Sequence, residues 1–222
     1  MRAFIFDLDG TLVDSLEDIG QACNDVLASH GYPVHPLPAY RFYVGRGFHK
    51  LVNDALPEGE AAKLSSDQLT ALIAEARARY GENMCVRTKP YAGITEALHQ
   101  LADDGHALAV LSNKPDDLTV ELVSRYFPDV PFALVRGGRE GVPLKPEPDA
   151  PLDMLRHMDF LPERSFYVGD SNVDIFTARN AGMISIGVAW GFRGADELRA
   201  AQADHVIDTP VALARLAKGG II

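Results

Sequence analysis

The stretch AFIFDLDGT, residues 3–11, runs from four apolar residues into two acidic residues two positions apart. The apolar part, Ala3–Phe6, is short and rich in side chains that favour strands, so it predicts a buried strand. Asp7 and Asp9 then lie at the carboxyl end of that strand, where open α/β sheets place their ligands. Because strand side chains alternate with a period of two, both carboxylates share one side while the chain is extended. From the spacing alone, a divalent-cation site that draws in a phosphate and an ordinary acidic turn are equally supported.

Further β-rich runs recur along the chain, with helical stretches between them. This alternation predicts βαβ units and a parallel sheet, so the fold class is predicted to be α/β with a Rossmann-like core. The expected strands are Ala107–Leu111, Phe132–Val135, Phe166–Val168, Ile184–Val188 and His205–Ile207, and the expected helices are Ile94–Leu101, Asp117–Phe127 and Ala150–Met158.

Residues 15–89 break this rhythm because they carry only helical signals. A first helix is expected to begin at Ser15, with Asp18 as its capping partner, and to end at Gly31. Two more are expected at Lys50–Leu56 and at Asp67–Tyr80, the latter capped by Ser65 or Ser66. The sequence therefore predicts a helical insertion, residues 15–89, in an α/β domain made of residues 1–14 and 90–222.

The composition of the chain excludes some classes of binding partner. The chain has 21 basic and 31 acidic side chains and a formal charge of -10, and no stretch concentrates lysine and arginine as a nucleic-acid surface requires. No window approaches the roughly 20 apolar residues of a membrane span. The apolar run at the N-terminus is broken by Asp7 before it reaches the length of an export signal. We expect a cytoplasmic protein without nucleic-acid or membrane partners.

A second acidic cluster follows the predicted strand Phe166–Val168. Asp170 would lie at the start of a helix, and Asp174 one turn along on the same face. Taken alone, a helix cap with an acidic first turn is the simpler interpretation. Two acidic strand ends in one sheet can converge, however, and hard oxygen ligands without histidine or cysteine suit Mg²⁺ rather than zinc.

Two further segments could hold an anion. Ser112 and Asn113 end the strand Ala107–Leu111 and offer a hydroxyl and backbone donors, although the same composition is common in turns. Lys145 lies in a segment stiffened by Pro143 and Pro146. A solvated surface lysine is the default for such a residue, and a phosphate-balancing cation is the alternative.

Taken together, these motifs resemble the haloacid dehalogenase-like hydrolase superfamily, in its phosphatase branch. Its four motifs are matched in order by Asp7-x-Asp9-Gly10-Thr11, by Ser112, by Lys145, and by Gly169-Asp170-x-x-x-Asp174. The insertion at residues 15–89 is similar to the helical cap that this superfamily places after its first motif. Within the superfamily the chain is most similar to the phosphoglycolate phosphatase-like group, judged from the runs SNKP at 112–115 and AWGF at 189–192.

The resemblance implies a division of labour between the side chains. Asp7 would attack phosphorus and give an aspartyl-phosphate, while Asp9 would protonate the leaving oxygen and then activate water. The implied Mg²⁺ ligands are Asp7, Asp9 through its backbone carbonyl, Asp170 and Asp174, and the implied phosphate-binding residues are Thr11, Ser112, Asn113 and Lys145.

The implied activity is Mg²⁺-dependent hydrolysis of a small phosphate monoester, with 2-phosphoglycolate the first candidate. A sugar-phosphate mutase, or a phosphatase of sugar phosphates or nucleotides, is the alternative, since these relatives share the core motifs. A further alternative is a phosphate-binding module without catalytic activity. Asp9 counts against dehalogenation and phosphonate cleavage, because relatives with those activities typically lack it. The expected state is a monomer or homodimer.

The insertion offers one candidate for substrate recognition. Gly45 and Arg46 lie in the run VGRGF, residues 44–48, where two glycines flank an arginine. Such a loop could close and present a guanidinium to a substrate carboxylate. A helix–helix turn with a solvated arginine explains the same residues equally well.

Overall fold

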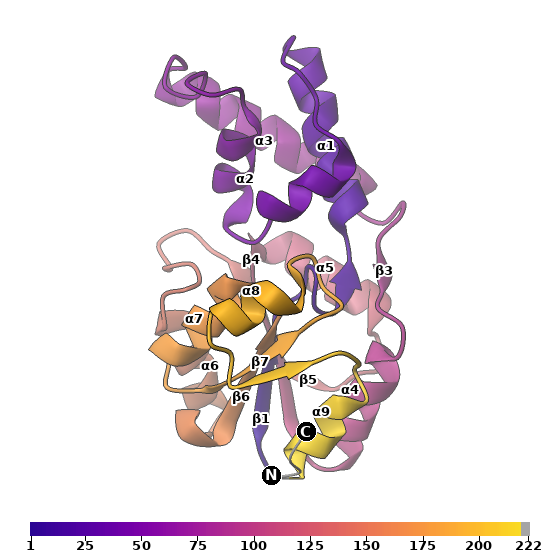
Figure 1. The fold of residues 1–222 in the computed structure, drawn as a ribbon. Helices are drawn as coiled ribbons and strands as arrows, with labels where there is room; N and C mark the ends of the chain where they lie inside the picture. The colour runs from indigo at the N-terminus through magenta and orange to yellow at the C-terminus, as the bar shows by residue number, and fades with distance from the viewer. Residues whose placement is uncertain (219–222) are drawn as a thin grey trace. The chain divides into compact units, whose positions relative to one another are not determined.

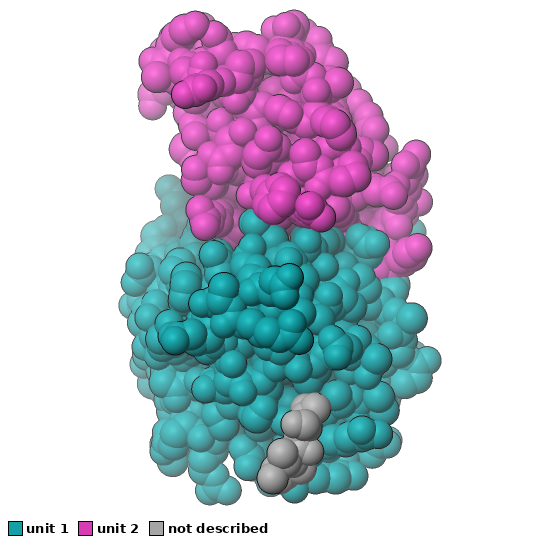
Figure 2. Space-filling model, viewed as in Figure 1, with its two compact units in different colours: residues 1–14, 90–222 teal, residues 15–89 magenta. Residues whose placement is uncertain are grey.

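The computed structural model describes residues 1–218 and divides the chain into two compact units (Figure 2). Unit 1 consists of residues 1–14 and 90–222, and unit 2 of residues 15–89. The roles expected for them, a catalytic core and a cap, stay predictions.

Within the described residues, unit 1 is built on a six-stranded sheet in the order β5-β4-β1-β6-β7-β8. Every neighbouring pair of strands in it is parallel, so the predicted α/β, Rossmann-like fold class is confirmed. The strands are β1 Ala3–Phe6, β4 Ala107–Pro115, β5 Phe132–Gly138, β6 Ser165–Gly169, β7 Ile184–Val188 and β8 His205–Ile207.

Helices cover both faces of this sheet (Figure 1). They are α4 Ile94–Asp103, α5 Asp116–Tyr126, α6 Asp149–Met158, α7 Asn172–Asn180, α8 Gly194–Ala200 and α9 Ala212–Ala217, with a short 3-10 helix at Pro162–Arg164. On one face Ile5 packs in a core with Met154 of α6 and Ala178 of α7. On the other face the ring of Phe4 stacks on Phe166, with 4.7 Å between centroids. Both faces of β1 are therefore buried, which explains its unbroken apolar run.

Strand β4 extends four residues beyond the predicted end at Leu111. Ser112, Asn113 and Lys114 are poor strand formers by composition, yet all three are buried. Pro115 still pairs with Gly138 of β5 after a register shift. Burial and pairing with β5 thus override the local sequence and carry polar side chains into the sheet.

Unit 2 is helical, as the sequence indicates. It contains α1 Leu16–Ser29, a 3-10 helix at Leu37–Phe42, α2 Gly47–Ala55 and α3 Ser66–Asn83. Ser65 caps α3 in a capping box with Gln68. Two short strands, β2 Val13–Asp14 and β3 Lys89–Pro90, pair where the chain passes between the units.

The capping box predicted for Ser15 and Asp18 is wrong. The Ser15 side chain makes no cap hydrogen bond to α1. The buried carboxylate of Asp18 instead accepts hydrogen bonds from the backbone N–H groups of Arg87 and Thr88 and from the Thr88 hydroxyl. The returning chain brings buried donors that need an acceptor, so a distant partner replaces the local one.

No helix in residues 1–218 is both long and apolar enough to cross a membrane.

Candidate active site

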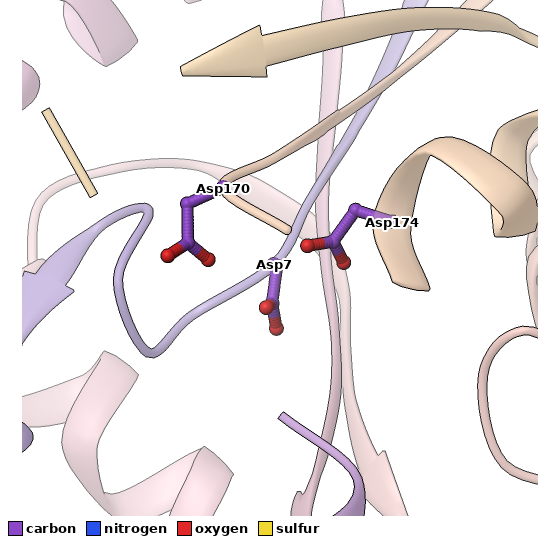
Figure 3. Close-up of side chains that lie close together, drawn as sticks. All are labelled: Asp7, Asp170 and Asp174. Atoms are coloured by element: carbon purple, nitrogen blue, oxygen red, sulfur yellow. The ribbon is translucent and has the colours of Figure 1, made fainter. Parts of the chain in front are cut away.

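Three carboxylates converge at the carboxyl ends of β1 and β6 (Figure 3). These strands are neighbours, and Asp7 N–H extends their ladder with a hydrogen bond of 2.8 Å to Val168 O. Asp170 follows β6 directly, and Asp174 lies in the first turn of α7. One oxygen from each of Asp7, Asp170 and Asp174 lies within 4.8 Å of the others, and all three residues are buried. The structure thus brings together three predicted metal ligands.

Glycines make this convergence possible. Gly10 has φ +85°, and a Cβ there would lie 2.3 Å from the Oδ2 of Asp170. A Cβ at Gly191 would lie 2.2 Å from the Cβ of Asp170 and 2.4 Å from the carbonyl oxygen of Gly10. The next residue, Phe192, donates its N–H to the Oδ2 of Asp170 at 2.7 Å. The 191–192 segment therefore fixes the orientation of Asp170.

Lys145 is the cation of the cluster. Its Nζ lies 2.9 Å from Asp7 Oδ1 and 2.7 Å from Asp174 Oδ1, with only 2% of its side chain exposed. Burial by itself would lower the pKa of Lys145, but Asp174 and Asp7 raise it well above its ordinary value. The ammonium is therefore retained, and the default expectation of a solvated surface lysine is wrong.

The charges of the cluster do not balance. Burial, reinforced by the Asp174 carboxylate, raises the pKa of Asp7 to about 7 despite the opposing effect of Lys145. Burial, followed by Asp174 and Asp7, also raises the pKa of Asp170 well above its usual range. One ammonium is too little charge for three buried carboxylates, whereas a divalent cation would offset the excess. Oxygen-only ligands of this kind fit a hard cation.

Asp174 serves the helix and the site at once. Its Oδ2 accepts hydrogen bonds from the backbone N–H and the hydroxyl of Ser171, and the first of these is half of the capping box of α7. Its Oδ1 faces Lys145. The helix-cap interpretation of this acidic turn is therefore confirmed, and the role of Asp174 as a metal ligand stays a prediction.

Asn113 contacts Lys145 through the backbone. Its Nδ2 donates to Lys145 O at 3.1 Å, and its Oδ1 accepts from Lys145 N–H at 2.8 Å. Both amide atoms hold the main chain of Lys145, and direct binding of phosphate by Asn113 stays a prediction. Ser112 is buried beside it and accepts a 3.3 Å hydrogen bond from Lys114 N–H at its Oγ.

Thr11 is fully buried, and its Oγ1 has no hydrogen-bond partner among the described residues. Its carbonyl oxygen accepts a 3.1 Å hydrogen bond from the indole N–H of Trp190. The hydroxyl thus has hydrogen-bonding capacity left for another group.

Asp9 lies in a separate ion pair. Its carboxylate oxygens are 2.6 and 2.7 Å from Nζ of Lys114, and both residues are buried. Sequence reasoning assigned Lys114 no function. One feature of the sequence could have indicated a role for Lys114. It follows an apolar strand and two polar residues, so it lies at the sheet edge, where it can face the carboxylates that follow neighbouring strands.

Gly45 and Arg46 belong to unit 2. Arg46 is the N-cap residue of α2, between Gly45 with φ +108° and Gly47 with φ +83°. Positive φ at both glycines is consistent with the expected turn. A role in substrate recognition stays a prediction.

Known proteins are similar to this chain in both sequence and fold. Residues 4–188 match the family model of the haloacid dehalogenase-like hydrolases. The phosphoglycolate phosphatase of Mannheimia succiniciproducens is 34% identical over 191 residues, which cover 84% of this chain and 85% of that protein. The corresponding enzyme of Pseudomonas putida is 32% identical over 211 residues, covering 93% of this chain and 76% of that protein.

A solved structure agrees. The crystal structure of a predicted phosphoglycolate phosphatase from Haemophilus somnus superimposes with a TM-score of 0.87 at 26% identity, over 97% of each chain. The resemblance to the phosphoglycolate phosphatase-like group is thereby confirmed. With Asp7, Lys145, Asp170 and Asp174 in one buried cluster and a family match over most of its length, this chain belongs to the haloacid dehalogenase-like hydrolases.

Proposed function

We propose that this protein hydrolyses 2-phosphoglycolate through an aspartyl-phosphate on Asp7. Relatives at about the same identity, 34% and 32%, carry the name phosphoglycolate phosphatase. The observation that carries the chemistry is the buried cluster in which the Lys145 ammonium lies against Asp7 and Asp174. A nucleophilic carboxylate beside a fixed cation suits a phosphoryl group, whose transfer depends on positioning and charge stabilisation.

In the first step an Asp7 oxygen forms a bond to phosphorus while the bond from phosphorus to the ester oxygen breaks. Lys145 binds phosphoryl oxygens and keeps the Asp7 carboxylate and the anionic ester from repelling each other. Asp9 gives a proton to the leaving oxygen, so the product is a free alcohol.

In the second step Asp9 takes a proton from water as the water oxygen bonds to phosphorus. The bond from Asp7 to phosphorus breaks, inorganic phosphate leaves, and the Asp7 carboxylate is restored. The Asp9 side chain pairs with Lys114 and lies outside the cluster of Asp7, Asp170 and Asp174.

Asp7, Asp170 and Asp174, with the backbone carbonyl of Asp9, would hold Mg²⁺. When bound, Mg²⁺ supplies the positive charge that lets an anionic ester approach an anionic nucleophile. The three buried carboxylates with raised pKa values at Asp7 and Asp170 support this assignment.

The remaining assignments concern the substrate. The hydroxyls of Ser112 and Thr11 would donate to phosphoryl oxygens, and Arg46 would bind the substrate carboxylate. We place the reaction in the cytoplasm, on a small phosphorylated metabolite, with the protein as a monomer or homodimer.

Phosphate release from a panel of esters tests the proposal. The panel holds 2-phosphoglycolate, sugar phosphates and nucleoside monophosphates, each assayed with Mg²⁺ and with EDTA. We expect Mg²⁺-dependent release with the highest kcat/KM for 2-phosphoglycolate, and essentially none from Asp7→Asn. Preference for a sugar phosphate or nucleotide would keep the chemistry and reject the substrate. Release from no ester would reject hydrolysis and leave mutase activity or a binding module.

A further inference from the structure

Lys114 forms a second buried ion pair beside the cluster. Its Nζ donates to both oxygens of Asp9, at 2.6 and 2.7 Å. The Lys114 side chain is 2% exposed and that of Asp9 is 9% exposed. A lysine so deeply buried is rare unless it is paired, and two short hydrogen bonds hold both carboxylate oxygens against the ammonium. The orientation of Asp9 is therefore fixed from the second motif's strand, β4.

The backbone of Lys114 is itself fixed on both sides. Its N–H donates to the Oγ of Ser112 at 3.3 Å, and its carbonyl oxygen accepts from the hydroxyl of Thr119 in α5 at 3.2 Å. Gly137 of β5 leaves room for this carbonyl, because a Cβ there would lie only 2.5 Å from it. The ammonium that holds Asp9 is thus carried by a backbone that contacts α5 on one side and β5 on the other.

We infer that Lys114 is the positioning residue for Asp9, holding its carboxylate where it takes the proton from water when the aspartyl-phosphate is hydrolysed. This inference rests on the proposed function. The proton passes from water to Asp9, the water oxygen bonds to phosphorus, and the bond between phosphorus and Asp7 breaks. The carboxylate form of Asp9 that this step needs is the form that pairs with an ammonium.

The inference predicts which step fails when the pair is broken. In Lys114→Met the Asp9 side chain loses its anchor, so hydrolysis of the aspartyl-phosphate slows. Partners that orient a reacting group typically contribute about 10- to 100-fold. 4-Nitrophenyl phosphate has a leaving group that needs no proton, so its first step remains fast. We expect a burst of one equivalent of 4-nitrophenolate followed by turnover about 10- to 100-fold slower than in the wild type.

A double-mutant cycle isolates the path through Asp9. Asp9→Asn is expected to show the same burst, and adding Lys114→Met to it is expected to slow turnover no further. Lys145→Met, which removes the other buried ammonium, serves as the matched control. It should abolish the burst, because it disables attack by Asp7 in the first step.

Other outcomes overturn the inference. Additive effects of Lys114→Met and Asp9→Asn, or loss of the burst, would show that Lys114 acts on phosphate directly. A rise in KM confined to carboxylated esters would assign it to the substrate carboxylate. Lys114→Gln repeats the experiment if the methionine variant fails to fold, with thermal unfolding as the check. A wild type that hydrolyses no ester rejects the proposed function itself, whereas an active wild type with additive variants rejects only the role of Lys114.

Discussion

Asn113 holds the main chain of a residue in the carboxylate cluster. Its amide makes two hydrogen bonds to the backbone of Lys145, whose ammonium pairs with Asp7 and Asp174. A small displacement of that backbone moves the charge that faces the nucleophile. Positioning errors of this kind lower rates strongly even when no reacting group is removed.

Asn113→Ala is therefore expected to lower kcat/KM about 10- to 100-fold. It should also reduce the free energy of unfolding by about 1–3 kcal/mol, because buried backbone groups of Lys145 lose their partners. Steady-state kinetics and thermal unfolding measure the two effects. Asn180→Ala is the control, since Asn180 donates to the neighbouring carbonyl of Pro146 at an exposed position. Equal kinetic losses in both variants would contradict the assignment.

The residues that sequence analysis found are those with a fixed spacing in the chain. Asp7 and Asp9 follow β1, Asp170 follows β6, and Asp174 lies in the next helix turn, so topology brings them to one edge. Lys114 was missed because its partner lies 105 positions away, and no local pattern records such a contact. The hydrogen-bond partners of the Asn113 side chain could not be predicted from the sequence either, since an amide can bind a phosphate or a backbone group equally well.

At the level of elements, the turn after β1 depends on Gly10. The positive φ of Gly10 is unfavourable for other residues, and its missing Cβ leaves space for the Asp170 carboxylate. Gly93, the N-cap residue of α4, has a similar φ of +79°, but a Cβ there would meet no atom of the described chain within 4 Å beyond its immediate neighbours. Comparing substitutions at Gly10 and Gly93 therefore separates the cost of backbone strain from the cost of a clash with Asp170.

Gly10→Ala and Gly93→Ala should each cost about 1–2 kcal/mol of stability through the backbone. Only Gly10→Ala should also weaken Mg²⁺ binding, because the new methyl group displaces Asp170. The increase in Tm on adding Mg²⁺ measures this loss. A full Mg²⁺-induced increase in Gly10→Ala would show that Asp170 does not depend on the glycine.

Element boundaries were predictable where the local sequence and the tertiary structure agree. Strands β1, β7 and β8 have the predicted bounds, and each is followed by an acidic or small residue, namely Asp7, Ala189 and Asp208. Strand β4 is longer than predicted because its polar end is buried. Asp18 was assigned to a helix cap because a carboxylate in a first turn usually serves there, whereas its donors come from Arg87 and Thr88.

At the scale of the molecule, the carboxylate cluster links stability to pH. Without metal, burial raises the pKa of Asp7 to about 7, against about 3.9 for an exposed aspartate. Between these values the folded state binds more protons than the unfolded state, so the free energy of unfolding falls as pH rises from about 4 to about 7. Asp170 acts in the same direction.

We expect the Tm in EDTA to fall over this pH range, and to fall less in Asp7→Asn. With Mg²⁺ the trend should weaken or reverse, since the metal binds the deprotonated carboxylates and its affinity grows with pH. Thermal unfolding at several pH values, with Mg²⁺ and with EDTA, provides the measurement. Identical slopes for the wild type and Asp7→Asn in EDTA would contradict the assignment to Asp7.

The position of β1 between β4 and β6 bears on how the protein is made. Asp7 leaves the ribosome long before either neighbour of its strand, and before the Phe192 N–H that orients Asp170. The nascent chain must therefore keep an apolar strand and its acidic turn unpaired until those segments follow. Fragments that end before residue 192 lack the N–H group that orients Asp170, so we expect them to be inactive.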